Sequence, residues 1–182
     1  MAKLAQKEKF VTKTFRVSQD LWRPIEEKAR REGMSVNQLV NQILKRYNDM
    51  IWSDRYKALT ISPETFETLI KGLSDDYIEA SGREMGSTAP KSGLMMVGMP
   101  LNLDSIVQLM TRGFDEHMNW FQCDHHKTKD EIIFHMRHSF GRKWSAFLNS
   151  YISSMFTSTL GMEVRSEILD GAVTVYARLN KM

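Results

Sequence analysis

Two threonines and an arginine stand at alternate positions of residues 11–17, in the segment VTKTFRV. Thr12, Thr14 and Arg16 share one side of this alternation. The opposite side carries Val11, Lys13, Phe15 and Val17. Hydroxyl and guanidinium groups hydrogen-bond to base edges and to phosphates, and arginine paired with guanine is the commonest specific contact. The spacing therefore predicts nucleic-acid contact by these three side chains, although threonine is also frequent in strands for its β-propensity alone.

The elements that must position these side chains follow from the sequence pattern. Period-two alternation predicts a β-strand over residues 11–17, with one wet and one buried face. Ser18 is expected to cap a helix over residues 19–32, which Gly33 ends. Ser35 then begins a second helix that continues past Tyr47. The apolar faces of the two helices comprise Leu21, Ile25, Ala29, Leu39, Val40, Ile43, Leu44 and Tyr47.

This N-terminal segment has too little chain for a core of its own. A strand and two short helices usually need a metal, disulfides or a partner subunit to fold. The segment contains neither cysteine nor a cluster of metal ligands, and its strand has no second strand within reach of a hairpin. An unpaired strand must pair with another chain, so the sequence predicts a homodimer.

The segments TFRVS and REGMSVNQLVNQIL, with their caps and turn, resemble the ribbon-helix-helix family, the Arc, MetJ and CopG type of repressor. The resemblance covers residues 9–49. It implies that two chains pair their strands into an antiparallel ribbon that enters the DNA major groove. The base-reading positions of the family fall on Thr12, Thr14 and Arg16, and Phe15 and Val17 fall on inward-facing positions. We expect phosphate contacts from Lys9, Lys13, Ser35, Val36 and Asn37, the last three at a helix N-terminus, which is an anion site.

Charge is distributed unevenly along the chain. The net charge is only +3, but residues 1–57 hold 13 Lys and Arg against 7 Asp and Glu, and the remaining residues hold 12 against 15. A basic head on an acidic body is expected of a segment that contacts DNA. The lysines before residue 10 form either an arm along the phosphates or a solubilising tail.

Composition places the chain among globular proteins, with 42% hydrophobic and 26% charged residues. No apolar run approaches the roughly eighteen residues of a membrane span, and the first ten residues do not resemble a signal peptide. Cys123 is the single cysteine, which excludes an internal disulfide and suits a reducing cytoplasm. The sequence therefore predicts a cytoplasmic protein without a membrane segment.

The rest of the chain, residues 60–182, has the pattern of a second domain. Ser62 and Ser74 are expected to cap helices, residues 82–98 read as a loose region rich in Gly, Ser and Pro, and residues 101–120 read as an amphipathic helix. A hairpin, a helix ended by Gly161 and a second hairpin turning at Asp170–Gly171 follow. The predicted fold class is α+β: a ribbon-helix-helix dimerisation and DNA-binding module over residues 1–59, then an α+β domain with a mostly antiparallel sheet packed on helices.

Cys123, His125 and His135 are the weak candidates for a metal site in the second domain, because Cys and His are the preferred ligands of zinc, nickel and copper. Cys123 and His125 alternate onto one strand face, and a hairpin would bring His135 beside them. Nickel-responsive ribbon-helix-helix repressors carry a C-terminal metal domain, but the ligand spacing here departs from theirs. Histidines with ordinary hydrogen-bond partners around a buried thiol explain the pattern better, so we expect no metal and no other cofactor.

The sequence thus predicts a homodimeric, sequence-specific transcriptional regulator that binds double-stranded DNA. The stretch FHMRHSFGRKWSAFLNSYISSMF also resembles the second domain of archaeal ribbon-helix-helix regulators, which implies no particular ligand. The alternatives are a metal-responsive Cys/His sensor and an antitoxin-like module that binds a protein. Phosphate-binding loops and nucleophile elbows are absent from the sequence, so we expect no enzyme, with Cys123 beside a histidine as the sole catalytic pair to consider.

Overall fold

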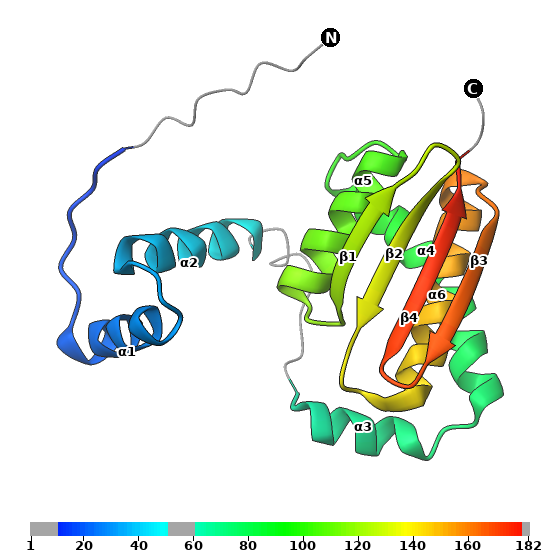
Figure 1. Ribbon diagram of the computed structural model, residues 1–182, viewed down its shortest axis with the longest axis horizontal. Coiled ribbons are helices and arrows are strands. Elements are labelled where there is room, and N and C mark those ends of the chain that lie inside the picture. Colours follow the sequence, from blue (N-terminus) through cyan, green and yellow to red (C-terminus); the bar gives the residue numbers. More distant parts are fainter. Residues whose placement is uncertain (1–10, 51–60, 180–182) are drawn as a thin grey trace, which may run out of the picture. The chain divides into compact units, whose positions relative to one another are not determined.

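The computed structural model describes residues 11–50 and 61–179 (Figure 1). The chain divides into two compact units, Met1–Tyr47 and Asn48–Met182. The boundary predicted between residues 59 and 60 lies outside the described residues. Within the described residues, no helix is both long and apolar enough to cross a membrane.

The first unit contains the two predicted helices, α1 (Gln19–Arg31) and α2 (Val36–Met50). Gly33, with φ of +66°, makes the turn between them. The N–H groups of Gly33 and Met34 donate to the carbonyls of Arg30 and Ala29, which closes the end of α1 as a Schellman motif. Ser18 is the N-cap residue of α1, as predicted, but its side chain makes no capping hydrogen bond.

Residues 11–18, which precede α1, form neither helix nor strand in the single chain. Figure 1 shows them as an extended trace that leads into α1. A strand exists only through hydrogen bonds to a neighbouring strand, and no segment of the described chain pairs with this one. The strand over residues 11–17 and the ribbon that it would form therefore remain predictions.

The second unit is an α+β structure whose sheet and central helix agree with the prediction. Two hairpins, β1 (Gln122–Lys127) with β2 (Glu131–Arg137) and β3 (Val164–Leu169) with β4 (Ala172–Arg178), flank the helix α6 (Gly141–Leu160). The four strands form one antiparallel sheet in the order β1-β2-β4-β3.

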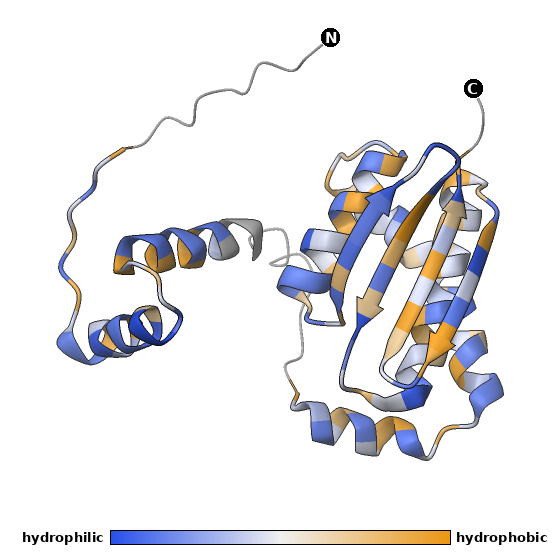
Figure 2. Ribbon diagram, in the orientation of Figure 1, coloured by the Kyte–Doolittle hydropathy of each residue, from blue (hydrophilic) through white to orange (hydrophobic). Residues whose placement is uncertain are grey.

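Helices cover one face of this sheet and bury its apolar residues. Phe134 and Val175 face α6 and are fully buried, as are Leu148 and Ile152 of α6 itself. Figure 2 shows the central strands β2 and β4 as largely hydrophobic and the edge strand β1 as hydrophilic. The second unit thus has a core of its own, formed between the sheet and the helices.

Residues 82–98, predicted to be loose, are mostly helical, and that prediction is wrong. The helix α4 runs unbroken from Asp75 to Met96, after the short helix α3 (Pro63–Lys71). Gly82, Gly86 and Pro90 lie one turn apart on the buried stripe of α4. These small residues let α4 pack closely along α6, so they are contact positions and not breaks.

The predicted caps are confirmed, since the Ser62 and Ser74 side chains accept N–H groups of the first turns of α3 and α4.

The helix predicted over residues 101–120 is two elements, the α-helix α5 (Leu103–Gln108) and the π-helix η2 (Leu109–His117). A π-helix has more residues per turn than an α-helix, so the side chains of η2 point in other directions than they would in a continuous α-helix. Met110 and Phe114 remain in the core, while the Asp115 carboxylate accepts the backbone N–H of Cys123 at 2.9 Å. The prediction of a single amphipathic helix missed this change of period. The hydrogen bond between Asp115 and Cys123 joins η2 to β1.

Candidate nucleic-acid interface

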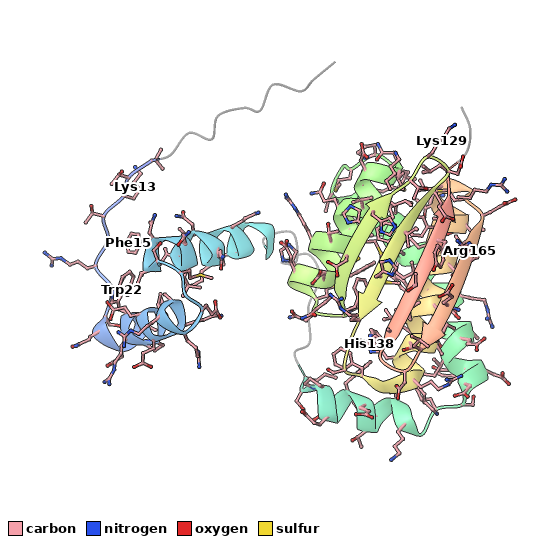
Figure 3. All side chains as sticks on the ribbon, viewed as in Figure 1. Lys13, Phe15, Trp22, Lys129, His138 and Arg165 are labelled. Atoms are coloured by element: carbon pink, nitrogen blue, oxygen red, sulfur yellow. The ribbon has the colours of Figure 1, made fainter. Side chains whose placement is uncertain are left out.

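The segment predicted to contact DNA is solvent-exposed over its whole described length. Thr12, Thr14 and Arg16 are exposed, and so is Phe15, at 59%. Figure 3 shows the Phe15 side chain close to that of Trp22, at the start of α1. Both residues line one shallow groove together with Lys13, Thr14, Val17 and Gln19. Lys9 lies outside the described residues.

Several large apolar side chains of this segment and of the helices that follow it are uncovered. Among residues 11–45 and 47, whose burial the structure describes, only Ala29 and Leu39 are buried. The uncovered apolar side chains are Val11, Phe15, Val17, Leu21, Ile43, Leu44 and Tyr47. A small folded unit seldom exposes so many large apolar residues unless they bind another molecule. The described residues of the first unit thus bury too few side chains to form a core that would stabilise a single chain.

The N-terminus of α2 is built by a reciprocal capping box. The Ser35 N–H donates to Gln38 Oε1 at 2.8 Å, and the Gln38 N–H donates to Ser35 Oγ at 3.2 Å. Val36 and Asn37 occupy the first two helical positions, where backbone N–H groups have no intrahelical acceptor. The structure therefore brings Ser35, Val36 and Asn37 together at one helix end that favours anions. Gln38 was missed at the sequence level, although a Ser followed three residues later by Gln signals such a box.

The structure separates the three metal candidates between two faces of the sheet. Cys123 and His125 pair with Met136 and Phe134, so both lie on the face that packs against the helices. His135 pairs with Asp124 and lies on the opposite face, where its Nδ1 is 3.2 Å from Thr174 Oγ1. The expectation that a hairpin would bring His135 beside the other two is wrong, because side chains alternate along a strand and His135 is opposite Asp124, whose side chain points away from the face of Cys123 and His125. No group of three or more metal-ligating side chains occurs in residues 11–50 or 61–179.

Burial makes Cys123 a poor metal ligand and a poor nucleophile. The surrounding protein, and next the Asp115 and Asp124 carboxylates, raise the pKa of the Cys123 thiol from 9.0 to about 12. The thiolate is the form that binds metals and attacks substrates. A rise of three units leaves roughly a thousandfold less thiolate near neutral pH. The raised pKa of Cys123 therefore argues against both the metal-sensor and the enzyme alternatives.

We expect Cys123 in the folded chain to react with iodoacetamide at pH 8 on the order of a thousandfold more slowly than an ordinary cysteine. The rate should increase with pH well beyond pH 9, since half of the thiol is deprotonated only at the raised pKa. Mass spectrometry of samples quenched over time gives the rate, and the same chain in guanidinium chloride is the control. An equal rate in folded and unfolded chains would contradict the raised pKa.

A search of protein-family models and a search of curated proteins find no match to this chain. Membership of the ribbon-helix-helix family therefore stays a prediction from residues 9–49.

Proposed function

We propose that the protein is a homodimeric, sequence-specific DNA-binding transcriptional regulator whose first unit is a ribbon-helix-helix module. The observation that carries this proposal is the uncovered apolar surface of residues 11–47. A second copy supplies the missing core, because Phe15 and Val17 of both chains turn inward when residues 11–17 pair. The same pairing turns Thr12, Thr14 and Arg16 outward, toward base edges in the major groove.

Two further features support DNA as the partner. The N–H groups at the start of α2 form an anion site next to the turn at Gly33, and dimerisation supplies two such sites for phosphates. The basic excess of residues 1–57 adds attraction to the duplex. The antitoxin-like alternative usually involves a short disordered tail, whereas residues 61–179 include a well-packed core.

Random-site selection with the purified full-length protein tests the proposal. We expect enrichment of an inverted repeat, because a twofold dimer reads two half-sites of opposite orientation. Recovery of unrelated sequences after several rounds, at a protein concentration where the dimer forms, would overturn sequence-specific DNA binding. Enrichment of a single, non-repeated site would overturn the twofold dimer on DNA.

Affinity for the selected duplex should fall steeply with salt concentration. Each phosphate neutralised by the protein contributes about −0.9 to the slope of log affinity against log salt concentration. The two anion sites and the basic side chains of a dimer engage several phosphates at once. Fluorescence anisotropy at a series of potassium chloride concentrations measures the slope. A slope near zero would show that phosphates are not neutralised and would contradict DNA as the partner.

A further inference from the structure

The two edges of the sheet in the second unit are built differently. At the β1 edge, the outward N–H of Cys123 donates to the Asp115 carboxylate, and η2 packs against β1. At the β3 edge, residues 165–169 are all exposed. Figure 1 shows β3 as the outermost strand on its side of the sheet. An exposed edge is a template for another strand, so β3 is the edge that can accept one.

The backbone of β3 has a definite set of outward groups. The Arg178 N–H donates to the Glu163 carbonyl at 2.9 Å, and Glu163 therefore turns its backbone groups toward β4. Backbone direction alternates along an antiparallel ladder. Arg165, Glu167 and Leu169 therefore bond to β4, whereas the N–H and C=O groups of Val164, Ser166 and Ile168 point away from the sheet.

The side chains of β3 are complementary to a second β3 that runs antiparallel to it. With a twofold axis at Ser166, Arg165 lies opposite Glu167 of the second copy, and Val164 lies opposite Ile168. The charged pairs fall at positions without hydrogen bonds, where side chains approach most closely. The outward backbone groups at Val164, Ser166 and Ile168 then bond to those of Ile168, Ser166 and Val164 in the other copy. We propose that the β3 edge pairs in this register with β3 of a second copy of the chain, which joins two sheets into one.

The two neighbouring registers of the same two strands place like charges together. An axis at Arg165 sets that arginine against its own copy, and an axis at Glu167 does the same for the glutamate. Like charges directly opposed destabilise a strand pair. Only the axis at Ser166 matches both charges, so the sequence of β3 selects a single register.

The charged side chains are already held on the outer face of the sheet. The Arg165 guanidinium lies 3.5 Å from the centre of the Tyr176 ring and 3.3 Å from the Glu131 carboxylate. The Tyr176 hydroxyl donates to Glu167 at 3.2 Å. Figure 3 labels Arg165 on the face of the sheet turned toward the viewer. Both charges thus already have partners in their own subunit, and pairing with the second copy requires the Arg165 side chain to turn from β2 toward the β3 edge.

The proposed β3 interface lies in the second unit and does not require DNA binding. It shares with the proposed function only the presence of a second copy of the chain. Cysteine cross-linking without DNA tests it separately from DNA binding. In a full-length chain carrying Cys123→Ser, a Ser166→Cys variant places two thiols opposite each other on the axis. Their Cα atoms would lie about 5.5 Å apart, within the roughly 4.4–6.8 Å that a disulfide spans. We expect rapid disulfide-linked dimer formation under mild oxidation.

The matched control is Ile168→Cys in the same background. Its thiols belong to the same exposed edge, but the register places their Cα atoms about 14 Å apart, so we expect little cross-linking. Equal cross-linking at both positions, which random collision or pairing through the first unit alone would give, overturns the proposal. Absence of cross-linking at Ser166→Cys also overturns it.

A charge exchange provides a second test in the Ser166→Cys background. Glu167→Arg sets Arg against Arg in both pairs, and Arg165→Glu sets Glu against Glu. We expect each variant alone to cross-link at least about tenfold more slowly than its parent. An equimolar mixture restores both opposite-charge pairs, so the mixed dimer should form at close to the parent rate. A mixture that cross-links no faster than either variant alone would refute the register.

Discussion

Replacing Arg16 with Ala should abolish preference for the selected site and leave the dimer folded. Arg16 is exposed and lies before α1, so its loss should not unfold the first unit. A bidentate arginine–guanine pair contributes about 1–3 kcal/mol of discrimination against the wrong base, and a dimer carries two copies. Competition between the selected duplex and a scrambled one, followed by fluorescence anisotropy, measures the change.

The matched control for this experiment is Arg23→Ala. Arg23 also lies in the first unit and is exposed, and its guanidinium contacts Glu27 at 3.2 Å. Exposed pairs of this kind contribute little to stability, so the variant removes one positive charge without removing a base contact. Arg23→Ala should weaken both duplexes alike. If Arg16→Ala also weakened both alike, Arg16 would contact phosphate and would not read bases.

Local signals in the sequence predicted most of the elements of this fold. Ser62 and Ser74 cap helices as expected, and Gly161 ends α6 with φ of +63°. The Asp170–Gly171 turn joins β3 to β4. Each of these features depends on a few neighbouring residues, because a cap or a tight turn is decided by local backbone geometry.

The features that the sequence did not predict depend on residues distant along the chain. The face on which His135 lies is set by its register with β1, which no spacing between His125 and His135 determines alone. The π-helical turns of η2 coincide with the contact between Asp115 and Cys123. In the candidate interface, the strand predicted over residues 11–17 stays a prediction, because a strand forms only by pairing and no described segment of the chain pairs with this one.

The clearest wrong prediction concerns the segment around Gly86. Its glycine content predicted a loop, but α4 continues through it. Glycine within a helix costs about 1 kcal/mol relative to alanine, so its presence there needs a reason. That reason is the distance between helices. A Cβ atom at Gly82 would lie 2.7 Å from the Phe147 carbonyl oxygen, and one at Gly86 would lie closer still to the Tyr151 carbonyl of α6.

We therefore expect Gly86→Ala to destabilise the second unit by about 3 kcal/mol or more, although alanine is the better helix former. The added methyl group meets backbone atoms of Tyr151, which cannot rotate away, so α4 and α6 must separate along their shared face. Urea unfolding followed by tryptophan fluorescence measures the loss, because Trp144 of α6 is buried and its ring centre lies 5.4 Å from that of the partly buried Trp120.

Gly72→Ala distinguishes this collision from a general effect of removing glycine. A Cβ atom at Gly72 would have no atom within 4 Å, and the φ of −79° there suits alanine. The unfolding midpoint of this variant should stay close to that of the parent, which corresponds to a change in the free energy of unfolding within about 0.5 kcal/mol. Equal midpoints for the Gly86 and Gly72 variants would mean that α4 can withdraw from α6 at little cost, and close packing would then not explain why a helix contains these glycines.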